Sequence, residues 1–167
     1  AGAGSGFGCA VLGNNYLKNV KVKYLLDSGD NITTRKILSS SDFSQIFPYS
    51  DQADLIFIDE AHLIPGVGQG LKIIVDQRPE KKIIATGSSS FELAGQIGEP
   101  LVGRKWTLIL YPVSQFELQK LVSAYELKQK LPEYLIFGSY PEVITAKNRE
   151  QKIRILREIA DSYLFKD

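Results

Sequence analysis

The sequence predicts an α/β fold in which a parallel sheet is flanked by helices and followed by a helical C-terminal portion. Two observations predict the sheet: short apolar runs recur along residues 20–111, and segments of helix length separate them. Such spacing implies crossover connections, which parallel strands require. A third observation, apolar residues at helical spacing near the end of the chain, predicts the C-terminal helices. We therefore divide the chain into two parts, residues 1–112 and residues 113–167.

The predicted strands are four apolar segments that end at polar or turn-forming residues. The first, Val20–Leu26, alternates and then becomes apolar, and the turn cluster Asp27–Asn31 follows it. The second, Leu55–Ile58, is an unbroken apolar run, which is typical of a strand buried on both faces. Lys82–Thr86 and Trp106–Tyr111 complete the set, because each combines β-branched or aromatic residues with a turn signal.

The predicted helices lie between and after these strands. Polar caps predict a short helix over residues 41–47 that ends before a proline, and a second helix covers Leu71–Gln77 after three glycines. Helical spacing predicts helices over Ser114–Leu131 and Arg149–Phe165, with the turn-rich segment Leu135–Ile144 between them. The last helix carries no stop signal, so we expect the natural chain to continue into a downstream domain.

The composition is that of an ordinary globular protein. The 167 residues suffice for a domain with a real core, and 44% of them are hydrophobic and 23% charged. A net charge of +1 gives no reason to expect a nucleic acid partner. The single cysteine, Cys9, excludes an internal disulfide and fits a reducing compartment. Because no apolar run approaches the ~20 residues of a membrane helix, we expect a cytoplasmic protein without a membrane segment.

Two adjacent acids, Asp59 and Glu60, follow the unbroken apolar run directly. The carboxyl ends of parallel strands form the edge at which open α/β folds bind ligands. Adjacent carboxylates repel each other, so a cation or a proton should relieve them. In nucleotide hydrolases the cation is magnesium, and the second acid polarises a water molecule. The acidic pair is therefore the first candidate for a catalytic site.

A set of segments along the chain carries a family resemblance. In order, they read LIFIDEAHLIP, IIATGSSSFEL, LVGRKWTLILYPVSQFEL, FGSYPEV and LREIADSYLFKD. Together they resemble the AAA-type P-loop ATPases of bacteria and archaea in which a C-terminal domain of unknown function follows the ATPase domain. The resemblance covers nearly the whole chain. It implies a P-loop NTPase-like fold that binds ATP and hydrolyses it with Mg²⁺, coupled to an unknown partner.

The resemblance also implies roles for individual residues. Asp59 and Glu60 match the Walker B pair, in which the first acid holds the magnesium shell and the second orients the attacking water. The segment after Ala85, TGSSS, matches the sensor position, where Ser88 or Ser89 would contact the γ-phosphate or the water, or else cap a helix. Arg104 would stabilise phosphoryl charge from its own or a neighbouring subunit, or else form a surface ion pair. A role from a neighbouring subunit would require self-association.

The N-terminal stretch AGAGSGFGCA stands where a phosphate loop is expected. Gly4, Ser5 and Gly6 would form the glycine-rich cradle whose backbone amides bind phosphate. However, Phe7 and Gly8 take the places of the lysine and the Ser or Thr that the motif needs. Two explanations remain open: a degenerate loop that binds nucleotide weakly, or first residues that do not represent the natural gene product.

Two alternative functions follow from these features. The missing lysine is evidence for a degenerate module that binds nucleotide or protein without hydrolysis. The tetrad DEAH, which ends at His62, suggests a nucleic-acid-dependent motor. Near-neutral charge and the absence of an evident basic, aromatic-lined groove count against the motor. We expect His62 to be a surface or packing residue and not a metal ligand.

Overall fold

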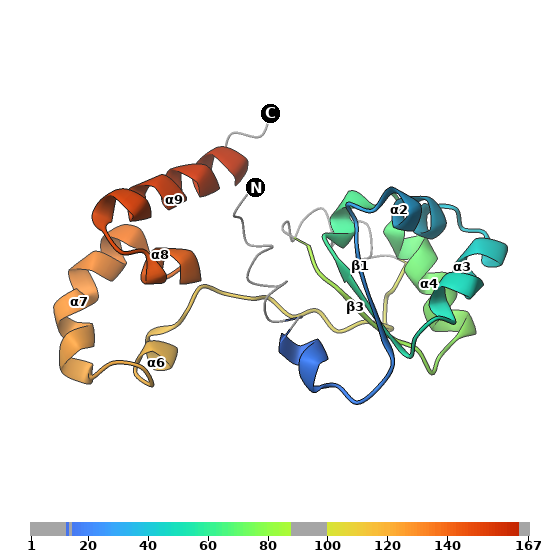
Figure 1. Ribbon diagram of the computed structural model, residues 1–167, viewed down its shortest axis with the longest axis horizontal. Helices are drawn as coiled ribbons and strands as arrows, with labels where there is room; N and C mark the ends of the chain where they lie inside the picture. The colour runs from blue at the N-terminus through green and yellow to red at the C-terminus, as the bar shows by residue number, and fades with distance from the viewer. Residues whose placement is uncertain (1–12, 14, 88–99, 164–167) are drawn as a thin grey trace. The chain divides into compact units, whose positions relative to one another are not determined.

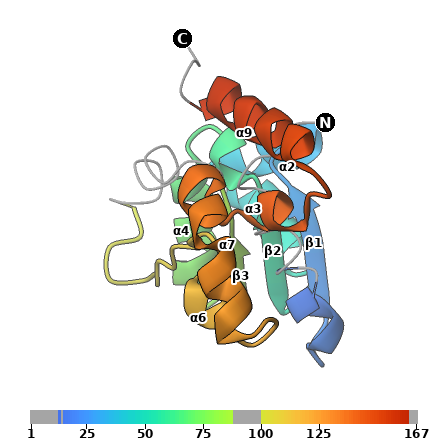
Figure 2. The same cartoon turned by 90° about the vertical axis from the view of Figure 1, so that its left-hand side faces the viewer.

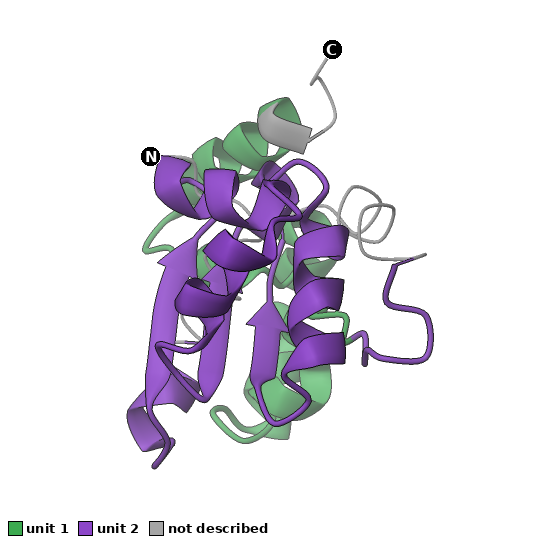
Figure 3. Cartoon of the chain, turned by 90° about the vertical axis from the view of Figure 1, so that its right-hand side faces the viewer, with its two compact units in different colours: residues 1–4, 108–167 green, residues 5–107 purple. Residues whose placement is uncertain are grey.

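The computed structural model describes residues 13, 15–87 and 100–163 (Figure 1). The chain divides into two compact units, one within residues 5–107 and the other from residue 108 onward (Figure 3). The first unit holds the sheet and the candidate site, and the regular elements that the structure describes in the second unit are helices. The domain boundary at residue 112 stays a prediction.

Three parallel strands form the sheet, in the order β1, β2, β3. They are β1 (Tyr24–Ser28), β2 (Leu55–Asp59) and β3 (Lys82–Ala85). In register, Phe57 lies between Leu26 of β1 and Ile84 of β3. The unbroken apolar run thus becomes the central strand, and its first four residues are buried. The predicted α/β fold with a parallel sheet flanked by helices is confirmed.

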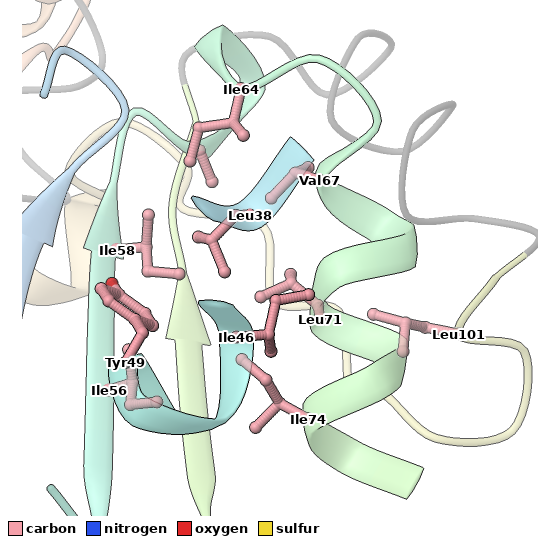
Figure 4. Packing of buried hydrophobic residues seen from close by; sticks show 11 residues of the cluster. Leu38, Ile46, Tyr49, Ile56, Ile58, Ile64, Val67, Leu71, Ile74 and Leu101 are labelled. Carbon is pink, nitrogen blue, oxygen red and sulfur yellow. The ribbon is translucent and has the colours of Figure 1, made fainter. Parts of the chain in front are cut away.

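The core lies on both faces of β2. On one face, Ile56 and Ile58 pack with side chains from α2 (Ile32–Ser39), α3 (Phe43–Ser50) and α4 (Val67–Gln77), as Figure 4 shows. On the other face, Leu55 and Phe57 of β2 pack with Leu17, which lies in the helical residues 15–19. Successive strand side chains point to opposite faces, so a strand covered on both sides needs an unbroken apolar run.

The first strand was predicted too early in the chain. It begins at Tyr24 and includes Asp27 and Ser28, which the sequence prediction placed in a turn. These two residues pair with the last two residues of β2, so tertiary pairing overrides their low strand propensity. The helix α2 was missed altogether. Its signal was present, because the side chain of Asn31 accepts a hydrogen bond from the backbone of Thr33 and caps the helix.

The helix α3 does not stop before Pro48, contrary to the prediction. It starts after its N-cap, Asp42, and continues to Ser50. A proline inside a helix removes a backbone hydrogen bond and costs roughly 3 kcal/mol. Ile46, before the proline, and Tyr49, after it, are buried in the core. Burial of one large apolar side chain stabilises the fold by about 1.5–3 kcal/mol. Core packing therefore carries the helix past the proline.

The helix α4 begins at Val67, four residues before its predicted start, and ends at Gln77 as predicted. It includes Gly70, which the sequence prediction treated as part of a loose connection. A Cβ atom on Gly70 would lie 2.3 Å from the carbonyl oxygen of Leu38 in α2. The glycine therefore lets α4 approach α2 closely, and this packing offsets the poor helix propensity of glycine.

The predicted strand Trp106–Tyr111 is wrong. These residues adopt no regular structure, and Trp106 is 98% exposed. A strand requires a hydrogen-bonded neighbour, and none of the strands in the part of the chain that the structure describes pairs with this segment. Aromatic and β-branched composition alone does not make a strand.

The second unit contains the predicted C-terminal helices. They are α6 (Gln115–Leu118), α7 (Ala124–Phe137), α8 (Pro141–Thr145) and α9 (Arg149–Tyr163). α9 contacts α7 and α8 (Figure 2), and Nζ of Lys152 lies 2.7 Å from Oε1 of Glu133. The helical C-terminal portion is thus confirmed. Among the residues that the structure describes, no helix has the length and apolarity to span a membrane.

The predicted helix over residues 114–131 is in fact two helices. Ser123 begins α7 with a capping box, in which its side chain accepts from the backbone of Glu126 and the Glu126 carboxylate accepts from the backbone of Ser123. Ser114 and Glu117 form the same arrangement at α6. A second cap marks a new start, which apolar spacing alone does not reveal. The predicted turn-rich segment is also partly helical, since α8 follows the turn at Gly138.

Candidate functional site

The acidic pair lies at the carboxyl end of the central strand. Asp59 is the half-buried last residue of β2, and Glu60 follows it. In register, Ser28 at the end of β1 lies beside Asp59. On the other side, β3 ends beside Ile58 and continues into Thr86. The ends of three parallel strands therefore meet here, which is the edge where α/β sheets bind ligands.

Thr86 connects β3 to the first acid. Its hydroxyl donates a hydrogen bond to Oδ1 of Asp59. Its backbone is held on both sides: its N–H donates to the carbonyl of Ile58 at 2.9 Å, and its carbonyl accepts from Ala61 at 2.8 Å. Hydrogen bonds to a charged acceptor are about twice as strong as neutral ones, so this contact orients the carboxylate. Thr86 begins the predicted sensor segment, but sequence reasoning chose the serines after it.

Glu60 has a backbone conformation that few side-chain-bearing residues adopt. Its φ of 50° and ψ of 39° lie in the left-handed region. The preceding carbonyl, that of Asp59, accepts a hydrogen bond from the backbone of Gly29 at 2.7 Å. A Cβ atom on Gly29 would lie only 2.0 Å from the carbonyl oxygen of Glu60. The loop after β1 therefore closes on the acidic pair, and only a glycine leaves room for this approach.

His62 is partly buried and packs beside Glu60, with its side chain almost fully covered, which fits the packing alternative of the prediction. It lies in η1 (Ala61–Leu63), the short 3₁₀ helix that follows the acidic pair. Its Nδ1 atom lies 3.2 Å from Oε2 of Glu60, and the two side chains are 7% and 24% exposed. Within the described ranges, no three His, Cys, Asp or Glu side chains are grouped to hold a metal ion.

Asp27 anchors the loop that carries Gly29. Its carboxylate accepts hydrogen bonds from the hydroxyls of Thr34 and Tyr49 and from the side chain of Asn31. Burial, and next the charge of Asp27, raise the pKa of Tyr49, so this phenol stays a donor. Sequence reasoning assigned Asp27 to a turn, although it follows a strand-like run just as Asp59 does.

The structure does not bring Arg104 to the acidic pair. Its Nε atom lies 2.7 Å from Oδ1 of Asp76, the second-last residue of α4. α4 returns from the carboxyl edge of the sheet toward the amino end of β3, so Arg104 lies toward the edge opposite Asp59. Five other predicted site residues lie outside the described residues: Gly4, Ser5, Gly6, Ser88 and Ser89.

Comparison with protein families connects this geometry to a known domain. A family model described as an AAA domain matches residues 9–119, which include the whole sheet and the acidic pair. The chain belongs to the AAA domain family. No curated protein and no solved structure matches the chain. Membership accounts for the P-loop ATPase-like sheet and makes a nucleotide the expected class of ligand.

The side chains at this edge fit a magnesium ion. Magnesium prefers hard oxygen ligands, keeps several of its waters and takes one or two carboxylates from the protein. Asp59 offers such a carboxylate in an orientation that Thr86 fixes. Glu60 offers a second carboxylate, whose Oε2 lies 3.2 Å from Nδ1 of His62. The two adjacent acids are therefore held by different neighbours, which is what two different roles require.

Proposed function

We propose that this AAA domain binds ATP and hydrolyses it with the help of Mg²⁺. The observation that carries the proposal is the acidic pair at the carboxyl end of the central strand, with a hydrogen bond to Asp59 from Thr86, the residue after the neighbouring strand. Membership of the AAA family supports a nucleotide as the ligand. Phosphoryl transfer needs mainly positioning and charge stabilisation; a rigid sheet edge would supply the positioning, and the Mg²⁺ held by the acids would supply the charge stabilisation.

In this proposal the two acids divide the work. Asp59 would hold the magnesium ion through its water shell, and the hydroxyl of Thr86 would keep the carboxylate oriented. Bound magnesium would neutralise charge on the phosphates. Glu60 would orient the attacking water and accept its proton. Arg104 lies away from this site, so a role for it in stabilising phosphoryl charge would need a neighbouring copy of the chain.

A second candidate is a module that binds nucleotide or protein without hydrolysis. The sequence favours it at one place, since Phe7 and Gly8 occupy the positions of the phosphate-binding lysine and the magnesium-binding hydroxyl. A lysine's contact with phosphate is worth roughly 1.5–3 kcal/mol. At about 1.4 kcal/mol per tenfold, its loss weakens binding by about ten- to a hundred-fold.

We also propose that the chain comes from the group of AAA ATPases that carry a C-terminal domain of unknown function. The segments FGSYPEV and LREIADSYLFKD support this proposal. In the structure, the first leads into α8, and residues 156–163 of the second lie in α9. Both lie beyond the residues that the AAA domain model matches.

The test combines nucleotide binding with phosphate release. A fluorescent ATP analogue is titrated with and without Mg²⁺, and released phosphate is measured on the same protein. Glu60→Gln should keep binding and lose at least about a hundred-fold in turnover, because general base catalysis contributes about 10²–10⁴-fold. Asp59→Asn should weaken only the magnesium-dependent part of binding.

Asp54→Asn is the matched control. This acid precedes β2, at the amino end of the same strand, and its side chain is exposed beside Lys81. The substitution should change neither binding nor turnover. Binding without phosphate release in the unsubstituted protein would favour the non-hydrolysing module. Full turnover in Glu60→Gln would contradict the assignment of Glu60.

A further inference from the structure

The backbone of Glu60 is fixed from three directions. Its carbonyl accepts a hydrogen bond from Leu63 at 3.0 Å, and the next N–H, that of Ala61, donates to Thr86 at 2.8 Å. Gly29 lies against the same carbonyl from the loop after β1. A left-handed conformation costs a residue with a side chain roughly 1–2 kcal/mol and persists only where its surroundings determine it. The side chain of Glu60 therefore leaves the backbone in one fixed direction.

That direction leads to His62. The imidazole Nδ1 lies 3.2 Å from Oε2 of Glu60, and the ring is nearly buried. The ring cannot easily move away, because the chain is held in the core before and after His62. Ala61 and Ile64 are both fully buried. A buried polar ring costs free energy unless a polar partner compensates it. The carboxylate of Glu60 is the charged group beside the ring, with Oε2 within 3.2 Å of Nδ1.

We propose that His62 is a positioning residue that holds the carboxylate of Glu60 in the orientation needed for water activation. This inference rests on the proposed hydrolytic function. A glutamate side chain has three torsions, and a fixed backbone alone does not place its carboxylate. Misplacement of a reacting group by about 1 Å can cost about a hundred-fold in rate. The buried imidazole supplies the restraint that the backbone lacks.

The first test examines the contact itself and needs no turnover. The chain contains one histidine, so the imidazole ¹⁵N signals in an NMR spectrum belong to His62 alone. Glu60→Gln should shift these signals, because it replaces a charged oxygen with an amide. Glu80→Gln, a substitution of an exposed acid after α4, is the control and should leave them unchanged. Unchanged signals in Glu60→Gln would overturn the inference.

The second test examines the catalytic consequence. His62→Ala should lower kcat about ten- to a hundred-fold and leave KM for Mg-ATP unchanged, since His62 acts through Glu60 and not on the nucleotide. His62→Asn should recover much of the loss, because the asparagine amide nitrogen can donate from the position of Nδ1. A purely structural histidine would not be rescued in this way.

The outcomes separate this inference from the proposed function. Turnover that falls equally in His62→Asn and His62→Ala, or a change in KM alone, would overturn the positioning role while the hydrolytic function stands. An unsubstituted protein that binds ATP and never releases phosphate would overturn hydrolysis and with it the catalytic role. In that case the imidazole signals would still decide whether His62 holds Glu60.

Discussion

Gly29→Ala tests whether the loop after β1 holds the acidic pair in place. The added Cβ atom would lie 2.0 Å from the carbonyl oxygen of Glu60 and 2.9 Å from its carbonyl carbon. Both are backbone atoms, so no side chain can rotate to relieve the contact. The loop must move away from Glu60, which also breaks the 2.7 Å hydrogen bond from Gly29 to Asp59.

The expected cost follows from these two changes. Overpacking costs about 1–3 kcal/mol, and loss of the hydrogen bond about 0.5–1.5 kcal/mol more. We therefore expect a destabilisation of roughly 2–4 kcal/mol, which lowers Tm by at least about 8 °C in a domain of this size. Displacement of Glu60 should also lower turnover about a hundred-fold. Thermal melts followed by circular dichroism and phosphate release measure the two effects.

Gly66→Ala is the control for Gly29→Ala. Gly66 has a φ of +64°, and a Cβ atom there would have no neighbour within 4 Å. Its substitution should cost about 1–2 kcal/mol from the left-handed backbone and leave turnover unchanged. A Gly29→Ala protein with the Tm and turnover of the unsubstituted protein would refute the reasoning, because it would show that the loop is not in contact with Glu60.

Three further predictions concern other contacts. Thr86→Val removes the hydroxyl bonded to Asp59 and should weaken Mg-dependent nucleotide binding at least about ten-fold in calorimetry, whereas Thr86→Ser should not. The backbone N–H and then the hydroxyl of Ser123 hold the pKa of Glu126 below its usual value. The cap of α7 therefore contributes its full stabilisation at a pH above the usual pKa of a glutamate. This stabilisation is lost as the pH falls through the lowered pKa of Glu126, so Glu126→Gln should reduce the acid-induced loss of helix seen by circular dichroism. Arg104→Ala removes an exposed ion pair and should lower the free energy of unfolding, measured by denaturant titration, by less than about 1 kcal/mol; a larger loss would contradict the surface location.

The strands show what an apolar run can and cannot predict. The run Leu55–Ile58 was identified correctly because burial on both faces leaves an unbroken apolar pattern. Trp106–Tyr111 has the same kind of pattern and is not a strand, because strand formation depends on a neighbour that the pattern does not reveal. Conversely, Asp27 and Ser28 are poor strand formers that pair because β2 lies beside them.

The residues of the candidate site likewise divide into those that the sequence predicts and those that it does not. Asp59 and Glu60 could be predicted because they directly follow the buried run, so their position at the sheet edge depends on local sequence alone. The contacts of Gly29 and His62 with Glu60 could not be predicted, since they depend on the left-handed conformation of Glu60, which no sequence signal indicates. Thr86 is intermediate: its segment was recognised, but only the sheet register shows that its hydroxyl reaches Asp59.

The position of Arg104 narrows the alternatives that the sequence left open. Arg104 and the acidic pair belong to the same compact unit, so their separation is a property of one folded body. Within that unit the guanidinium is bonded to Asp76 near the end of α4, while Asp59 stands at the far end of the strands. A side chain cannot span a sheet from its amino to its carboxyl edge, because even a four-residue strand such as β3 is about 13 Å long. Stabilisation of phosphoryl charge by Arg104 within its own subunit therefore loses support. The alternatives that remain for Arg104 are a surface ion pair and a contribution to the site of a second copy.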